Sequence, residues 1–252
     1  MRRLARCLTV ALVLAMALAR VWALDLVVAG QAQVTIVIPD VPLPVQKSAA
    51  EELQYHVRRA CGVELPIVFE RYAKADQPSV YLGPCKQTLA LGLWPRECKP
   101  NGYLLRTVGN NLFICGDDTN GNVFWMQHAN RTRVGTLFGV YEVLQRELKV
   151  CWLWPGELGT VVPKSRDVKV GDWNEAGSPP FIHARWADYG IVSGLEGWSS
   201  NEVRERFIDE QGKWLRRHRF ALGVAMDMAH SFRDWWKIEG GQHPEYFHLL
   251  PD

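Results

Sequence analysis

An amphipathic helix pattern early in the chain constrains the fold most strongly. Apolar residues recur at every fourth position from Ala49 to Cys61, which places them on one face of a helix. Ser48 and Glu51 have the spacing of a capping box, so the helix is predicted to begin there. Gly62 is the expected C-terminal stop, because glycine readily adopts the left-handed conformation that ends a helix.

A second helix pattern begins near Thr136, with an apolar stripe from Leu137 to Leu148. Short apolar, β-branched segments surround the two helices, and Gly109-Asn110-Asn111 between two of them is typical of a hairpin turn. This order predicts an α/β or α+β layered domain over residues 24–171, about 150 residues long. The expected strands are Leu26–Ala29, Val34–Ile38, Ile67–Phe69, Val80–Leu82, Tyr103–Val108 and Leu112–Cys115, and Val161–Val170 is expected to close the domain.

The pattern restarts after a Gly/Pro-rich stretch at residues 172–180, which is predicted to be a linker. Eight of the eleven tryptophans lie after residue 150. Residues 181–252 resemble one strand–helix–strand unit, which cannot close a sheet or a barrel by itself. The expected elements are His183–Tyr189, a helix from Ser199 or Ser200 to about Arg219 with Val203, Phe207, Trp214 and Leu215 inward, and Phe220–Met228 as a buried strand parallel to the first.

The N-terminus has the organisation of a secretory signal peptide. Three early arginines precede an apolar run from Cys7 to Ala19, which is too short to span a bilayer. Val21 and Ala23 are small residues at the −3 and −1 positions, so cleavage is expected after Ala23. The sequence therefore predicts a secreted or periplasmic protein with no membrane segment after cleavage; the alternative is that the apolar run is an uncleaved anchor helix.

The charge balance gives no indication of a nucleic-acid partner. The formal net charge is +2, but residues 1–23 hold four arginines and no acid. The remaining chain has 25 basic and 27 acidic residues, so it is slightly acidic. Five cysteines remain beyond Ala23, and an odd number leaves at least one free. A Cys85–Cys98 disulfide and buried free thiols are both compatible with the sequence.

Several familiar motifs are absent or incomplete. The sequence contains no GxxxxGK[ST], GxGxxG, HExxH or CxxC pattern, so no cofactor and no metal is expected. Residues 116–122 start like a calcium loop but lack its glycine and its final glutamate, so they are predicted to be a polar loop. Asn130-Arg131-Thr132 is an N-glycosylation sequon. The polar run from His243 to His248 matches no mononuclear metal spacing.

Arg185, Asp188 and His230 are the candidate substrate-binding residues. They follow or end the two predicted strands of residues 181–252, and ligands of parallel α/β folds bind at the carboxyl ends of strands. Arginine and aspartate offer fixed donors and acceptors to sugar hydroxyls or to a carboxylate. The alternative is that Arg185 and Asp188 pair with each other.

Five segments, in order, resemble the N-terminal part of family 67 α-glucuronidases and related secreted proteins of unknown function. The first covers Ser48 to Ile67 and is similar to the family pattern AAxELxxYLxxxTGxxLPI. The others are Val80–Gly83, Gly135–Leu144 (similar to GTLYGVYxFLE), Cys151–Thr160 (similar to VRWLxPGxxGT), and the junction Pro180-Phe181 followed by Arg185. His243-Pro244-Glu245-Tyr246-Phe247 also matches a recurring HPEYF of the uncharacterised relatives.

The resemblance implies a non-catalytic α/β domain, similar to the second domain of hexosaminidases, followed by a (β/α)8 barrel. Residues 181–252 would then be the first, truncated part of that barrel. By the same resemblance Arg185 is a sugar-binding position, and the catalytic carboxylates lie beyond Asp252. Asp188, Asp227, Glu239 and Glu245 match no catalytic motif of the family.

Two functions follow from this resemblance. The first is the N-terminal part of a glycoside hydrolase-like protein that acts on uronic-acid-containing polysaccharide, with these 252 residues inactive alone. The second is a non-catalytic sugar-binding or scaffolding module. Both make carbohydrate the expected partner.

Overall fold

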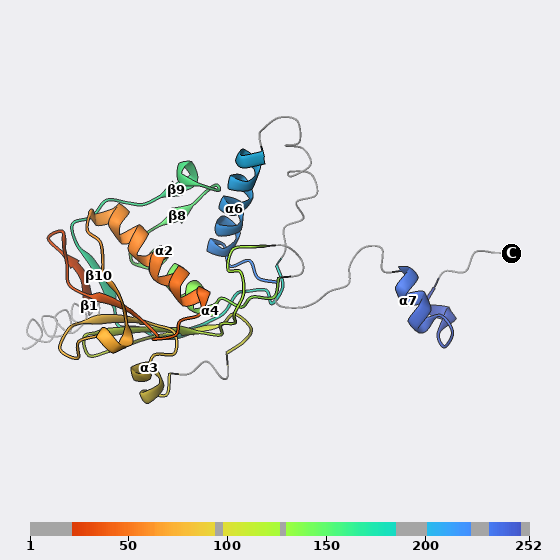
Figure 1. Ribbon diagram of the computed structural model, residues 1–252, viewed down its shortest axis with the longest axis horizontal. Helices are drawn as coiled ribbons and strands as arrows, with labels where there is room; N and C mark the ends of the chain where they lie inside the picture. Colours follow the sequence, from red (N-terminus) through yellow and green to blue (C-terminus); the bar gives the residue numbers. More distant parts are fainter. Residues whose placement is uncertain (1–21, 94–97, 127–129, 185–200, 223–231, 248–252) are drawn as a thin grey trace, which may run out of the picture.

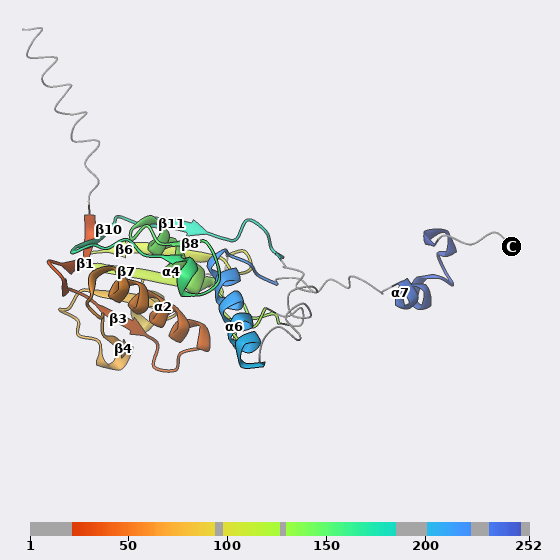
Figure 2. The same ribbon diagram turned by 90° about the horizontal axis from the view of Figure 1, so that it is seen from above.

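The computed structural model describes residues 22–93, 98–126, 130–184, 201–222 and 232–247. Two helices, α2 and α4, lie side by side on one face of a six-stranded sheet (Figures 1 and 2). The described strands are β1 (Trp22–Val28), β2 (Gln31–Ala32), β3 (Thr35–Ile38), β4 (Ile67–Phe69), β5 (Ser79–Leu82), β6 (Tyr103–Val108), β7 (Asn111–Gly116), β8 (Cys151–Trp152), β9 (Thr160–Val161), β10 (Val168–Gly171) and β11 (Asn174–Gly177). The helices are α2 (Pro44–Cys61), α3 (Lys86–Ala90), α4 (Gly135–Arg146), α6 (Asn201–Arg217) and α7 (Phe232–Glu239), with 3₁₀ turns at Glu70–Tyr72, Glu157–Gly159 and Pro244–Tyr246.

The main sheet has the order β11-β6-β7-β5-β3-β4. Strands β4, β3, β5 and β7 are parallel neighbours, while β6 and β11 continue the sheet in the antiparallel sense. A second sheet, β10-β1-β2, is antiparallel, and β8 pairs with β9. The described residues therefore form a mixed α/β fold, as the strand and helix patterns predict.

Alternation along the strands places apolar side chains on both faces of the main sheet. Ile36 and Leu112 belong to the large core beneath α2 and α4, whereas Val37, Tyr81 and Phe113 form a smaller cluster on the opposite face. Tyr81 and Phe113 stack with their ring centroids 4.9 Å apart. Burial on both faces explains why these parallel strands are apolar almost throughout.

The hairpin and both helices of the N-terminal domain are confirmed, but the first helix begins earlier than predicted. Pro44 occupies its first turn, where a missing N–H costs nothing, and the side chain of Gln46 accepts a 2.6 Å hydrogen bond from the Leu43 amide. Ser48 and Glu51 are therefore not the cap. Gly62 ends the helix in the left-handed conformation, at φ 75°, as predicted.

The stretch 172–180 is not only a connector. Asn174–Gly177 forms β11, which pairs with β6 at the edge of the main sheet, and Trp173 is fully buried. The Nε1–H of Trp173 donates a 3.1 Å hydrogen bond to Glu147. The glycine and proline content of this stretch predicted a linker because these residues are typical of turns. They are also tolerated in edge strands, and composition does not show that β11 pairs with β6.

The segment Val161–Val170, which is expected to close the domain, contributes to two strands. Val161 ends β9, and Val168 begins β10, which pairs with β1. Two register irregularities in the β1–β10 pairing show that the closing strand is bulged against its partner.

The described part of residues 181–252 changes two expectations. His183 and Leu222 form an isolated bridge that is antiparallel, and the Ala184 amide donates a 2.8 Å hydrogen bond to the Ala221 carbonyl, so the parallel pairing expected there is wrong for these residues. Helix α6 is present as predicted, with Leu215 buried, but Val203 is 45% exposed instead of inward. Trp236 of helix α7 contacts Phe247, just beyond the following 3₁₀ turn, edge to face.

The cysteines of the described residues are all free. Cys85 and Cys115 are buried, and burial raises the pKa of the Cys85 thiol to about 12. The Cys85–Cys98 disulfide is therefore not formed, and the free-thiol alternative describes Cys85 correctly.

No helix among the described residues has the length and apolarity needed to cross a bilayer.

Candidate functional site

The three residues singled out from the sequence, Arg185, Asp188 and His230, lie outside the described residues. Among the described residues, one candidate site is a cleft of about 240 Å³ between α2 and α6, with both polar and apolar lining. We call it the α2–α6 cleft. It is lined by Ser48, Glu51, Glu52 and Tyr55 of α2, by Phe124 of the connection between β7 and α4, by Gly156, Glu157 and Thr160 of the β8–β9 region, and by Glu210, Lys213 and Arg217 of α6.

Helical spacing brings the α2 side chains to the cleft. Ser48, Glu51, Glu52 and Tyr55 follow at i, i+3, i+4 and i+7, which is one face of a helix. On the adjacent stripe lie the buried residues Ala49 and Leu53, beneath the helix in the core, so the two stripes have different chemistry. Residues that resembled a helix cap in the sequence thus lie on the cleft.

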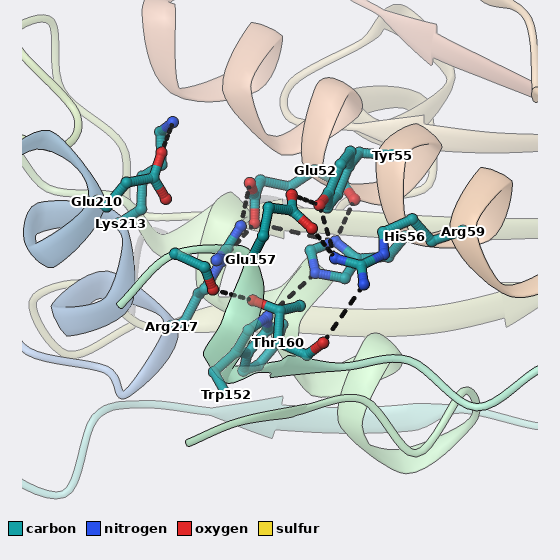
Figure 3. A network of polar contacts seen from close by, with 11 residues as sticks. Glu52, Tyr55, His56, Arg59, Trp152, Glu157, Thr160, Glu210, Lys213 and Arg217 are labelled. Atoms are coloured by element: carbon teal, nitrogen blue, oxygen red, sulfur yellow. Dashed lines mark hydrogen bonds and ion pairs between the residues drawn. The ribbon is translucent and has the colours of Figure 1, made fainter. Parts of the chain in front are cut away.

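One wall of the cleft is a network of Tyr55, Arg59 and Glu157 (Figure 3). The Tyr55 hydroxyl donates to Glu157, Arg59 donates to the same hydroxyl at 2.9 Å, and Arg59 also contacts Glu157 directly. Burial and the bond to Glu157 raise the pKa of Tyr55. The tyrosine hydroxyl therefore stays protonated near neutral pH and acts as a hydrogen-bond donor, not as a base.

The other wall is an ion pair between α2 and α6. Arg217 donates from Nε and Nη2 to the two carboxylate oxygens of Glu52, at 3.0 and 2.9 Å. The side chains of Arg217 and Glu52 are 6% and 12% exposed. Burial opposes the charge on Arg217, but Glu52 outweighs it, so the pKa of the guanidinium is raised. This two-point geometry fixes the position of both groups.

His56 lies beneath these groups and is fully buried. Its Nδ1 is 2.7 Å from the Glu52 carbonyl oxygen, and its Nε2 is 3.1 Å from the Trp152 indole Nε1. An indole N–H can only donate, so Nε2 accepts, and Nδ1–H donates to the carbonyl. Burial lowers the pKa of His56. Neutral His56 with both nitrogens satisfied is a structural histidine, not a proton-transfer group.

Four consecutive residues, Arg216 to Arg219, hold the end of α6 against the rest of the domain. Buried Arg216 donates to the carbonyls of Val123 and Thr132, and Arg219 contacts Glu142 at 3.2 Å. His218 lies 2.7 Å from the Trp152 carbonyl oxygen. Burial lowers the pKa of Arg216 to about 10, so it still carries its charge at neutral pH. Helix α6 therefore belongs to the same packed unit as α2 and α4.

Paired charges limit the chemistry of the cleft. Three of its four glutamates contact a cation: Glu52 with Arg217, Glu157 with Arg59, and Glu210 with Lys213. Hydrolysis of a glycosidic bond needs one carboxyl group that is protonated and free to donate. The cleft suits binding through fixed donors and acceptors better than acid–base catalysis.

Two polar sequence features have structural roles instead of functional ones. Asp118 accepts hydrogen bonds from the Thr136 amide and hydroxyl and from Gln46, and burial raises its pKa to about 6. It joins the starts of α2 and α4, whereas the sequence placed it in a polar loop.

Asn130 of the sequon is 7% exposed and bonds to the Asn122 and Trp125 carbonyls, so glycosylation of the folded protein would require local unfolding. No three metal-ligating side chains gather within the described ranges.

The sequence alone did not identify the cleft. One feature of the sequence did point to it: three arginines, Arg216, Arg217 and Arg219, lie at the end of a helix that has few apolar residues. Arginines that become buried require hydrogen-bond acceptors or carboxylates from other segments. This feature was ambiguous because basic residues also favour any helix C-terminus. The pairing of Glu52 with Arg217 spans 165 residues, which local patterns cannot predict.

Comparison with known proteins gives only distant similarity. No protein-family model and no curated protein matches the chain. One similar solved structure is titled "A novel family GH115 4-O-Methyl-alpha-glucuronidase, BtGH115A, with specificity for decorated arabinogalactans", with a TM-score of 0.48 and 15% identity over 78% of this chain and 25% of that chain. Another, "Structure of CpGH84D", has a TM-score of 0.32 and 8% identity over 66% of this chain and 25% of that one. The chain spans a quarter of each structure's length, and neither identifies its family or reaction.

Proposed function

We propose that this chain is part of an exported carbohydrate-active protein and that its α/β domain is a non-catalytic, sugar-binding domain. The resemblance of five segments to the N-terminal part of family 67 α-glucuronidases gives uronic-acid-containing polysaccharide as the substrate class. Arg185, Asp188 and His230 remain the proposed substrate-binding residues of the segment that follows.

One observation carries the proposal: three of the resembling segments meet at a single buried residue. Trp152, from the segment Cys151–Thr160, bonds to His56 of α2 and packs edge to face on Tyr141 of α4, with centroids 5.2 Å apart. The three segments that resemble the family in sequence thus contribute to one core, which supports interpreting them together as parts of a single domain.

The non-catalytic role of the α/β domain rests on its carboxylates. The described cleft holds glutamates that are engaged by Arg59, Arg217 and Lys213, and therefore lacks the free carboxyl pair that glycosidic hydrolysis requires. Catalysis of such a reaction would depend on other residues of the protein.

Affinity electrophoresis through gels containing soluble polysaccharide tests the proposal. We expect retardation by glucuronoxylan, no retardation by a gel of neutral dextran, and no release of reducing sugar from glucuronoxylan. Equal mobility in all gels would overturn the assignment to carbohydrate. If the protein hydrolyses glucuronoxylan and still does so when Glu52 and Glu157 are changed to glutamine, the binding role would stand. The catalytic residues would then lie in this chain but outside the cleft.

The export prediction has its own test. Expressed with residues 1–23 in a secreting host, the protein is expected outside the cytosol with Leu24 as its first residue. Cleavage there would retain five of the seven residues of β1, including the buried Leu24 and Leu26, so the β1–β10 pairing would persist. A full-length protein that stays in the cytosolic fraction would refute the export prediction.

A further inference from the structure

The α2–α6 cleft has properties that select among sugars. Its donors and acceptors are held in place before any ligand arrives: Glu52 by Arg217, Thr160 by a 2.9 Å bond to the Gly156 carbonyl, and Tyr55 by Arg59. Preorganised polar groups lower the entropic cost of binding. The cleft is therefore built to receive a ligand with several hydroxyls in a fixed arrangement.

The charge of the lining disfavours an anion. Four glutamates line the cleft against Lys213 and Arg217, and both of these cations already contact a carboxylate. Glu51 is exposed and has no ion-pair partner within the described residues. A ligand carboxylate placed here would be repelled by Glu51, because the charge of each cation at the cleft, Arg59, Lys213 and Arg217, is already offset by another glutamate.

Apolar surface and size complete the description. Tyr55 and Phe124 are both half-buried at the cleft and offer aromatic surface to the C–H groups of a sugar ring. The volume of about 240 Å³ is below the ~300–1,000 Å³ typical of sites that enclose a drug-sized ligand. The cleft therefore accommodates one ring or the end of a chain, not a long oligosaccharide.

We infer that the α2–α6 cleft binds an uncharged sugar unit of a polysaccharide and excludes its uronic acid units. The inference rests on the proposed carbohydrate function and refines it: recognition of uronate and recognition of the neutral backbone are assigned to different parts of the protein. The Glu51 carboxylate, the remaining acceptor site of the Tyr55 hydroxyl and the remaining N–H donors of Lys213 supply the polar contacts, and Phe124 supplies apolar surface.

Calorimetric titration of the full chain with xylohexaose and with free glucuronic acid tests the selection. We expect xylohexaose to bind, and hydrogen exchange to slow in peptides covering residues 48–55, 156–160 and 210–217. Tyr55→Phe is expected to weaken xylohexaose binding about tenfold, since a hydroxyl held between charged groups is lost. Tyr72→Phe, on an exposed tyrosine outside the cleft lining, is the matched control and should bind as the unmodified protein does.

The charge argument is tested by Glu51→Lys, with Glu64→Lys as the matched surface control. Adding a cation at the cleft should improve binding of glucuronic acid at least about fivefold, whereas the control should not. Glucuronic acid binding at the cleft of the unmodified protein would overturn the inference. So would xylohexaose binding that Tyr55→Phe leaves unchanged while exchange slows elsewhere.

The outcomes separate this inference from the proposed function. Retardation by glucuronoxylan without xylohexaose binding at the cleft refutes the inference and leaves the carbohydrate function standing. Cleft binding of xylohexaose without retardation by glucuronoxylan refutes the proposed substrate class and supports the neutral-sugar site. Binding to neither refutes both.

Discussion

Helices α2 and α6 face each other across the cleft, yet different forces hold them. Helix α2 buries Ala49, Leu53 and Val57 against the sheet, so burial of apolar surface holds it. Helix α6 also buries Leu215, but in addition Arg216 and Arg217 at its end, and Arg219 just beyond it, contact carbonyls and carboxylates of the rest of the domain. Apolar burial is nondirectional, whereas these polar contacts require a defined geometry. A cleft between two such helices has one rigid wall and one wall whose position depends on charge.

The largest expected effect is on the apolar side of this comparison. Leu53→Ala removes a fully buried side chain from the core and should lower the free energy of unfolding by about 2–5 kcal/mol. The matched change on α6, Val203→Ala, alters a 45% exposed side chain and should cost about 0.5 kcal/mol or less. Urea denaturation followed by circular dichroism measures both. Similar losses for the two variants would contradict the assignment of the larger stabilisation to the buried site on α2.

The polar side is tested by Glu52→Gln, which leaves Arg217 buried without its carboxylate. The expected loss is about 1–3 kcal/mol, and it should appear as faster amide exchange in α6 with α2 and α4 still protected. Glu51→Gln, one residue earlier and exposed, is the control and should leave exchange unchanged. Adding Arg217→Met to Glu52→Gln should recover part of the loss, because no unpaired charge then remains buried. Uniform destabilisation of all three helices would contradict this separation.

The free energy of unfolding is expected to depend on pH through Asp118, which joins the starts of α2 and α4. Its pKa is raised to about 6 from 3.8, so between these values the folded state binds more protons than the unfolded state. The stabilisation from this proton is complete below about pH 3.8 and is lost as the pH rises through about 6. Relative to Asp118→Asn, the unmodified protein should lose up to about 1.4 kcal/mol per pH unit in this window. A constant difference between the two proteins from pH 4 to 6 would contradict the raised pKa.

Local patterns predicted most of the N-terminal fold but not how its parts meet. The spacing from Ala49 to Cys61 and the turn at Gly109 report contacts within one helix or hairpin, and both predictions are confirmed. Strand β11 was missed because local composition does not show its pairing with β6. The start of α2 was misplaced because the helix begins at Pro44, about one turn before the capping-box spacing of Ser48 and Glu51. The cleft depends on contacts such as Glu52 with Arg217, which only the tertiary structure brings together.

The smallest expected effect on the free energy of unfolding comes from an exposed ion pair, which serves as the comparison for the buried pair between α2 and α6. Arg58 and Glu64 also form an ion pair near the end of α2, at 3.3 Å, but both side chains are 55% exposed. Water and salt screen such a pair, so Arg58→Ala should change the free energy of unfolding by about 0.5 kcal/mol or less. Arg217 and Arg58 have the same charged group and a glutamate partner, so a larger cost at Arg217 measures the combined effect of its burial, its two-point contact with Glu52 and its contact with the Trp152 ring. Equal costs for Arg58→Ala and Arg217→Ala in urea denaturation would mean that burial does not strengthen the contact, and the charge-dependent wall of the cleft would then be no more than a surface ion pair.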